Sequence, residues 1–331
     1  MLRKVTAAAA ALLVSSSLAA AAEISPAVVF DMGGKFDKSF NEGVYNGVEQ
    51  FKKETGIEYR EFEVTNETQR EQALRRMAQR GADPVIGVGF AQAPAMEKVA
   101  KEFPNIRFAI IDAVVDLPNV RSIVFKEHEG SFLVGMIAAM KSGTGKVGFV
   151  GGMDIPLIRK FACGYEQGAK HVSGDTEVVQ NMTGTTPAAW NDPTRGSELA
   201  KSQFDRGVDV IYAAAGGTGV GVYQTADDSG KLAIGVDSNQ NYLHPGTMLT
   251  SMLKRVDVAA YKAFKDAADD NWTSGIQVLG LAEDGVGWAL DEYNSDLVTA
   301  EMKAKVEQAA ADIVAGTLQV HDYTADNSCT Y

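Results

Sequence analysis

The stretch Phe108-Ala109-Ile110-Ile111-Asp112 is a short apolar run that ends in an acid, and this pattern recurs along the chain. A strand that is apolar on both faces is typical of a parallel sheet that helices cover on both sides. Such runs alternate with amphipathic stretches of helical length from Pro26 onward. Repeated strand–helix units with short connections form doubly wound open sheets. The sequence therefore predicts an α/β fold.

Polar residues stand at the carboxyl ends of the expected strands. We expect strands at 27–30, 59–64, 84–87, 108–111, 121–125, 146–150, 176–181, 208–213, 232–236, 248–253 and 276–281, and helices at 40–54, 68–80, 93–102, 130–141, 157–171, 194–206, 219–229, 257–271 and 299–315. Acids or glycines follow five of these strands: Asp31, Asp112, Gly151-Gly152, Gly216-Gly217 and Asp237. Ligands of open α/β sheets bind beyond the carboxyl ends of the strands. These residues therefore predict a binding crevice.

Residues 1–22 have the features of a cleaved export signal. Arg3 and Lys4 precede an apolar stretch at 7–14, and Ala20-Ala21-Ala22 offers a small-residue cleavage site. A buried N-terminal helix is the alternative. No cysteine lies near the cleavage site to carry a lipid. We therefore expect a mature protein that is freely soluble in the periplasm.

Length and charge limit the possible partners. A chain of 331 residues is long enough for two domains, each with its own core. Its formal charge of −12 argues against binding to nucleic acid or to anionic lipid. The same charge fits a protein that stays monomeric by self-repulsion.

The chain has two cysteines, Cys163 and Cys329. In an oxidising compartment such a pair is compatible with one disulfide, which would tie an internal helix to the C-terminal tail. Two free thiols are the alternative, because sequence does not give the geometry of the pair.

The stretch from Asp31 to Asn41, DMGGKFDKSFN, is a glycine loop between an expected strand and helix, with Asp37 or Ser39 available as the helix cap. It lacks the Gly-Lys-Ser/Thr order of a phosphate loop, and its two acids would repel phosphate. The loop therefore suits a neutral ligand that carries hydroxyls or a heterocycle. Phe40 could stack on a ring of that ligand or pack in the core.

Several longer motifs resemble the basic membrane protein family of ABC-transporter solute-binding proteins, in its purine-nucleoside-receptor-like group. The resemblance covers nearly all of the mature chain and is carried by these stretches: Gly33-Gly34 with Asp37-Lys38-Ser39-Phe40-Asn41, Phe125-Lys126-Glu127-His128-Glu129-Gly130-Ser131-Phe132-Leu133-Val134-Gly135, residues 146–152, Gly164-Tyr165 with Gly168-Ala169, residues 214–219, Ile234-Gly235-Val236-Asp237-Ser238-Asn239-Gln240, and residues 250–255.

This resemblance implies a type I periplasmic binding protein, in which three hinge strands join two Rossmann-like lobes. We expect one lobe at 23–126 plus 253–276 and the other at 127–252 plus 277–331. The hinges are expected at 126–127, 252–253 and 280–281. The implied partners are a small-molecule ligand in the cleft, with a purine nucleoside favoured, and the permease of an ABC importer. Contact with the membrane is expected only through the permease.

The resemblance also implies roles for individual residues. Phe40 and Trp190 would stack on the two faces of a purine base, and Trp190 stands where the family usually has Phe. Asp31 and Asp112 would bind base edges. Asp237, Lys254 and the backbone near Gly217 would hold the ribose. Met32 replaces a residue that is often Asn in nucleoside receptors, which removes one polar contact to the base.

Other chemistries have weaker support in the sequence. The glycines of 216–221 do not have the spacing of a dinucleotide fingerprint. The four histidines share no interval typical of metal ligands. There is no nucleophile elbow, and neither cysteine has a histidine nearby. We expect no metal, no cofactor and no catalytic set. The open alternatives are the same fold with a sugar, a free nucleobase or a quorum signal, and, less favoured, a nucleoside-processing enzyme.

Overall fold

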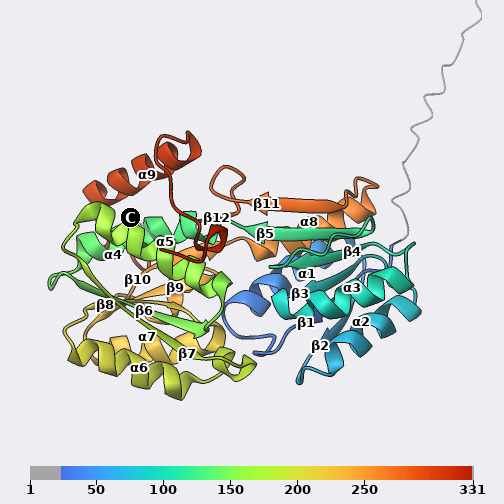
Figure 1. The fold of residues 1–331 in the computed structure, drawn as a ribbon, viewed down its shortest axis with the longest axis horizontal. Coiled ribbons are helices and arrows are strands. Elements are labelled where there is room, and N and C mark those ends of the chain that lie inside the picture. The colour runs from blue at the N-terminus through green and yellow to red at the C-terminus, as the bar shows by residue number, and fades with distance from the viewer. Residues whose placement is uncertain (1–23, 330–331) are drawn as a thin grey trace, which may run out of the picture.

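The computed structural model describes residues 24–329, so the predicted export signal lies outside the described residues. The chain forms two α/β lobes that lie side by side (Figure 1). Each lobe contains one six-stranded sheet with helices on both faces. Within the described part, no helix combines the length and hydrophobicity needed to cross a bilayer.

All strands of the first sheet are parallel, in the order β11-β5-β4-β3-β1-β2. The strands are β1 (Ala27–Phe30), β2 (Arg60–Glu63), β3 (Val85–Val88), β4 (Phe108–Ile111), β5 (Val120–Phe125) and β11 (Gly275–Leu279). The helices of this lobe are α1 (Phe40–Thr55), α2 (Gln69–Gln79), α3 (Ala93–Glu102) and α8 (Val256–Ala268). Side chains of β1 alternate between the two faces, so Val28 packs in the same core as α1 and α8, and Val29 in the core with α2 and α3.

The second sheet has the order β12-β10-β9-β8-β6-β7, and only β12 is antiparallel to its neighbour. Its strands are β6 (Lys146–Met153), β7 (Glu177–Gly184), β8 (Val210–Ala214), β9 (Leu232–Asp237), β10 (Met248–Lys254) and β12 (Val286–Trp288). The helices are α4 (Glu127–Lys141), α5 (Pro156–Val172), α6 (Pro193–Asp205), α7 (Gly219–Asp228) and α9 (Ala300–Val314). The predicted α/β class is confirmed.

Helices α4 and α5 approach each other closely because glycines lie at their contact. A Cβ atom on Gly168 would lie 1.9 Å from the carbonyl oxygen of Phe132, and one on Gly135 would lie 2.1 Å from that of Tyr165. No side chain fits at these positions unless the helices separate. This packing requires glycine at positions 135 and 168 of the chain.

The chain passes between the sheets three times: between β5 and α4, between β10 and α8, and between β11 and β12. The first passage coincides with the predicted boundary at 126–127. The boundaries predicted at 252–253 and 276–277 fall inside β10 and β11, which continue to Lys254 and Leu279. The hinge predicted at 280–281 lies at the start of the third passage.

Two details of the second sheet differ from prediction. Gly151-Gly152 does not follow β6 but lies within it, where Gly151 pairs with Met182 of β7. Glycine is a weak strand former, but the ladder to β7 carries the strand through it. The short strand β12 was not predicted, since three residues give too little pattern to recognise.

The C-terminal tail is fixed to α5. The structure joins Cys163 of α5 to Cys329 by a disulfide with a Cα–Cα distance of 5.6 Å. Gln167, one turn further along α5, donates to the carbonyl oxygen of His321 and accepts from its backbone N–H. The tail therefore lies across the helix that begins beside the interlobe cleft.

Candidate functional site

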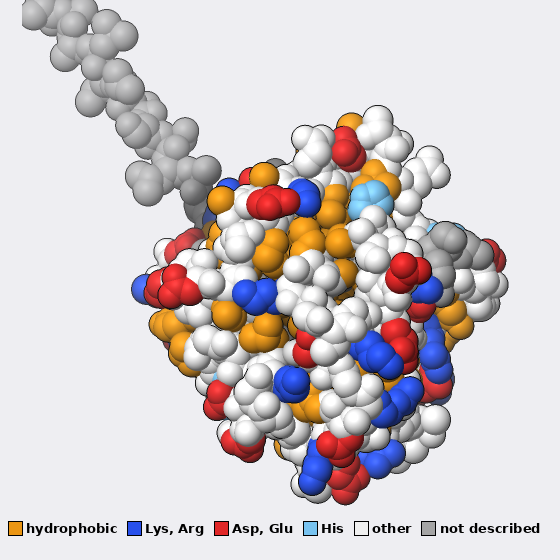
Figure 2. Space-filling view, turned by 90° about the vertical axis from the view of Figure 1, so that its left-hand side faces the viewer, with side chains coloured by type: hydrophobic (Ala, Val, Ile, Leu, Met, Phe, Trp, Pro, Cys, Tyr) orange, Lys and Arg blue, Asp and Glu red, His pale blue; other side chains and the backbone are white. Residues whose placement is uncertain are grey.

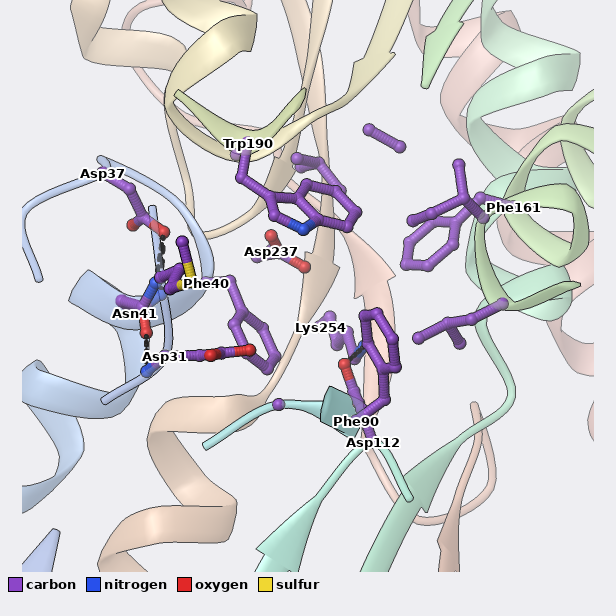
Figure 3. A pocket seen from close by; sticks show the side chains of 17 residues that line it. Asp31, Asp37, Phe40, Asn41, Phe90, Asp112, Phe161, Trp190, Asp237 and Lys254 are labelled. Carbon is purple, nitrogen blue, oxygen red and sulfur yellow. Dashed lines mark hydrogen bonds and ion pairs between the residues drawn. The ribbon is translucent and has the colours of Figure 1, made fainter. Parts of the chain in front are cut away.

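A cavity lies between the two lobes and is lined by residues from both (Figure 3). The space free of protein atoms is about 620 Å³, including the part open to solvent. This volume is in the range of small-molecule sites. Seven of the eight predicted binding residues line it: Asp31, Met32, Phe40, Asp112, Trp190, Asp237 and Lys254. The eighth, Gly217, is not part of the lining, but its neighbour Gly216 is.

The loop between β1 and α1 is held in place by one buried carboxylate. Asp37 accepts hydrogen bonds from the backbone N–H groups of Ser39, Asn41 and Glu42 at 2.9–3.1 Å. These groups would otherwise lack partners at the start of α1, so Asp37 is the helix cap. The cap fixes the first turn of α1, which carries Phe40 into the cavity.

Asp31 is held at the opposite end of the same loop. Arg70 of α2 donates to its Oδ1 at 3.1 Å, and the amide oxygen of Asn41 accepts from its backbone N–H at 3.2 Å. Burial raises the pKa of the Asp31 carboxyl above its ordinary value, while Arg70 opposes this shift. Asp31 thus presents a carboxylate whose direction is already set.

Aromatic side chains from both lobes surround the cavity. Phe40 comes from α1 of the first lobe, and Trp190 from the 3₁₀ turn Pro187–Trp190 of the second (Figure 3). The indole of Trp190 covers Gly152, where a Cβ atom would lie 2.1 Å from the ring. Gly152 is therefore needed for the ring to lie against β6. Rings that enter from opposite lobes can enclose a flat ligand between them.

Asp112 and Asp237 both have left-handed backbones at the ends of strands. Their φ angles are 71° and 63°, values that are uncommon for residues other than glycine. Asp112 follows β4 and Asp237 ends β9. Such conformations persist where the surrounding structure enforces them, and they are frequent at functional sites.

Lys254 lies where the carboxylates meet. Its Nζ is 2.7 Å from Asp112 Oδ2 and 2.9 Å from Glu127 Oε1, and its side chain is 1% exposed. It also lies 5.3 Å from the centre of the Phe40 ring, within the range of a cation–π contact. The cavity thus has one buried cation among several acids.

The charges of these groups influence one another. Burial alone would lower the pKa of Lys254, but Asp112, Glu127 and Asp237 together raise it above its ordinary value. Burial raises the pKa of Asp237 to about 6, although Lys254 and the Ser39 hydroxyl favour its ionised form. The pKa of Asp37 is also raised to about 6 by burial. Perturbed acids in an enclosed cavity are typical of functional sites.

The cleft is closed in this structure. The Ser39 hydroxyl donates to Asp237 Oδ2, Ser238 donates to the carbonyl oxygen of Ser39 at 2.9 Å, and Gln240 donates to that of Lys38 at 2.9 Å. These bonds join the start of α1 to the segment after β9. Contacts of this kind exist only when the lobes are together.

Several lining residues were not predicted: Asp37 and Asn41 as lining groups, Gly89, Phe90, Leu157, Ile158, Phe161, Ala214 and Val236. Phe90 follows Gly89 just after β3, a strand end with no acid to mark it. Phe161 lies inside α5, where an aromatic residue is indistinguishable from a core residue in sequence. Gly89 and Phe90 had a usable signal in sequence, their place just after an expected strand.

A second, open groove lies between α9 and the ends of α4 and α5. Its lining includes Met136, Met140, Val172 and Leu318, and none of the predicted site residues. The end of the molecule formed by the second lobe shows a band of hydrophobic side chains among charges of both signs (Figure 2). This groove shares no lining residue with the cavity between the lobes.

No group of three or more His, Cys, Asp or Glu side chains within residues 24–329 is arranged to hold a metal ion. The acids of the cavity are instead paired with Lys254, Arg70 or hydroxyl and amide donors.

The two-lobed fold with a ligand-sized cleft between its lobes is shared with ABC transporter solute-binding proteins. The family model described as "ABC transporter substrate-binding protein PnrA-like" matches residues 24–323, and the chain belongs to this family. It is 30% identical over 321 residues to the "ABC transporter nucleoside-binding protein BmpA" of Lactococcus lactis, covering 90% of this chain and 89% of that protein. A crystal structure of an ABC transporter solute-binding protein from Aeropyrum pernix superposes with a TM-score of 0.83 at 30% identity, covering 90% of this chain and 93% of the other. The predicted family is confirmed.

The predicted localisation is contradicted by the names of other relatives. Proteins of Pyrococcus abyssi and Pyrococcus horikoshii, 34% and 35% identical to this chain, are both called uncharacterized lipoproteins; the matches cover 89% and 88% of this chain and 76% and 75% of those proteins. A lipoprotein is held at a membrane by attached lipid. The names of these two relatives therefore conflict with the prediction of a mature protein that is freely soluble in the periplasm. The prediction relied on the lack of a cysteine near residue 22, in a segment outside the described residues.

Proposed function

We propose that this chain binds a purine nucleoside in the interlobe cavity and presents it, unaltered, to the permease of an ABC importer. The observation that carries the proposal is the pairing of two aromatic side chains from opposite lobes, Phe40 and Trp190, across a cavity whose ends carry carboxylates and Lys254. The nucleoside-binding name of the Lactococcus relative supports the same ligand class.

The base is proposed to lie between Phe40 and Trp190. Stacking on an aromatic side chain contributes about 1–3 kcal/mol per base, and every base offers a flat face. Asp31 and Asp112 offer carboxylate oxygens to N–H donors of the base. In support, Asp112 Oδ1 is buried and has no hydrogen-bond partner among the described residues. A buried acceptor of this kind is costly unless a ligand satisfies it.

The ribose is proposed to lie near Asp237 and Lys254, with the backbone around Gly216 and Gly217 close by. Vicinal hydroxyls can donate to the Asp237 carboxylate and accept from the Lys254 ammonium. A hydrogen bond to a charged group contributes about 1.5–3 kcal/mol. This end of the cavity therefore distinguishes a nucleoside from a free base.

Met32 lines the cavity beside Asp31 but offers no hydrogen bond to the base. We therefore propose that preference among adenosine, guanosine and inosine is modest. The sulfur is polarisable and packs well against aromatic rings.

Ligand binding is proposed to stabilise the closed arrangement of the lobes. A ligand held by residues of both lobes has its full set of contacts only when the cleft is shut. The closed, loaded monomer would then be the form that the permease recognises. No catalytic step is proposed: the acids of the cavity are paired with Lys254, Arg70 or the Ser39 hydroxyl.

Isothermal titration calorimetry tests this proposal directly. Adenosine, guanosine and inosine should each release heat with a stoichiometry of about one per chain, while adenine should bind more weakly and ribose should give no measurable heat. A sugar site would show the reverse order, and a free-base site would bind adenine as tightly as adenosine. After prolonged incubation, chromatography of the protein–nucleoside mixture from the calorimeter should recover intact nucleoside. Free base in that mixture would indicate an enzyme.

A further inference from the structure

Glu127, which does not line the cavity, is buried between two lysines. Its Oε1 lies 2.9 Å from Lys254 Nζ and its Oε2 lies 2.8 Å from Lys160 Nζ, and its side chain is 1% exposed. Burial alone would raise the pKa of Glu127, but Lys254 and Lys160 together hold it below its ordinary value. Glu127 is therefore an ionised carboxylate that joins the two cations.

Lys160 fixes Glu127 from the side away from the cavity. Its ammonium donates to Glu127 Oε2 and also, at 2.9 Å, to the carbonyl oxygen of Phe125. Lys160 belongs to α5, while Phe125 ends β5 and Glu127 begins α4. The carboxylate is thus clamped where the chain first passes between the lobes.

The three N–H donors of Lys254 are divided by this arrangement. One is directed to Asp112 and one to Glu127, which leaves one for another acceptor. Within residues 24–329 the ammonium donates to no third acceptor, and Lys254 lines the cavity. Two opposed carboxylates therefore set the direction of the remaining N–H, which a flexible lysine would not hold by itself.

We propose that Glu127 and Lys160 are positioning residues that aim the ammonium of Lys254 at the ribose hydroxyls and so set the preference for nucleosides over free bases. The inference rests on the proposed function. Neither residue touches the ligand. Each acts through Lys254: Glu127 by direct contact, and Lys160 by holding Glu127.

Glu127→Gln keeps the size of the side chain and removes its charge. The affinity for adenosine and guanosine is expected to fall about 10- to 100-fold, the worth of one well-placed charged hydrogen bond. The affinity for 2′,3′-dideoxyadenosine and for adenine should change less than about threefold, because these ligands lack the hydroxyls that Lys254 would contact. A residue with only a structural role would weaken all these ligands alike.

Lys160→Met is the second variant, and it keeps the test usable if Glu127→Gln does not fold. It removes the outer cation without altering any group that lines the cavity or contacts Lys254. The nucleoside affinity should fall by a smaller factor than with Glu127→Gln, again without loss of adenine binding. In the double variant the two losses should combine to less than their product, because both act on Lys254.

Asp266→Asn is the matched control. It removes the partner of another buried cation, Arg121, whose Nη1 lies 2.7 Å from Asp266 in the first lobe and away from the cavity. This variant should lower the melting temperature and leave every affinity unchanged. Equal losses for adenosine and adenine in both site variants, or no loss for either, would overturn the inference while the proposed function stands. A wild-type protein that binds no purine compound would overturn both.

Discussion

The ammonium nitrogen of Lys254 lies 2.7 Å from Oδ2 of Asp112, although Lys254 ends β10 of the second sheet and Asp112 follows β4 of the first. This ion pair crosses from one lobe to the other inside the candidate site. A buried pair recovers its desolvation cost only when its remaining donors and acceptors are satisfied. Oδ1 of Asp112 has no hydrogen-bond partner within residues 24–329, so the described part of the chain does not fully meet this condition. A polar ligand would complete it, which links binding to closure.

Truncating either stacking ring should weaken nucleoside binding. Phe40→Ala and Trp190→Ala are each expected to lower the affinity for adenosine about 5- to 150-fold, the range of one lost stacking contact. Calorimetry measures the change. Phe36→Ala is the control, because this ring lies in the same loop, is 58% exposed and does not line the cavity. Equal effects of Phe36→Ala and Phe40→Ala would contradict the sandwich.

Asp237→Asn should separate stability from binding. Ionising a buried acid with a raised pKa lowers the stability of the folded state. The Asp237→Asn variant should therefore have a free energy of unfolding about 1–3 kcal/mol higher than wild type at pH 7 without ligand. The same change should reduce nucleoside affinity at least about tenfold, since a charged acceptor for the ribose is lost. Urea unfolding and calorimetry on one preparation measure both. A variant that is less stable and binds normally would oppose this account.

The stability difference between wild type and Asp237→Asn should depend on pH with a defined sign. The folded pKa of Asp237 is about 6 and its ordinary value is 3.8, so the folded state holds this proton more tightly than the unfolded state. Its contribution to stability is therefore present at low pH and is lost as pH rises through about 4 to 6. The free energy of unfolding of Asp237→Asn should exceed that of wild type by almost nothing at about pH 4. The difference should grow up to about pH 6 and level off by about pH 7. Unfolding curves at four pH values test this, and a constant difference would contradict it.

Reducing the disulfide should destabilise the protein without changing the site. Cys163 and Cys329 are 166 residues apart, and loss of a native disulfide typically costs about 2–5 kcal/mol. The Cys163→Ser/Cys329→Ser protein should unfold at lower urea, while its adenosine affinity stays within about twofold because neither cysteine lines the cavity. Addition of reductant to wild type should shift the midpoint equally. An unchanged midpoint would mean that the tail contributes no stability through this bond.

The fold could be predicted because its signals are local. Runs such as Ala27–Phe30 are short and apolar throughout, and most of them are followed by a helix-length amphipathic stretch. The acids at the carboxyl ends of β1, β4 and β9 were found for the same reason, since a strand end is visible in sequence and all such ends gather at one edge of a sheet. The resemblance added Trp190 and Lys254.

The remaining parts of the site depend on contacts between distant segments. Glu127, Lys160 and Phe161 lie on helices, where a charged or aromatic residue could equally face solvent or the core. The predicted ends of β10 and β11 differ from the structure by one and two residues, because pairing with β9 and β5, rather than local preference, sets where the strands stop. The disulfide stayed open because spacing does not give geometry.

The central claim is that two rings and several carboxylates from separate lobes enclose an intact nucleoside. Native mass spectrometry of the mature protein, mixed with equal amounts of adenosine, guanosine, inosine, adenine and ribose, tests it most directly. We predict a complex of one chain with one intact nucleoside that persists through incubation. A complex with ribose or adenine alone, no complex with any compound, or the appearance of free base from a nucleoside would contradict it.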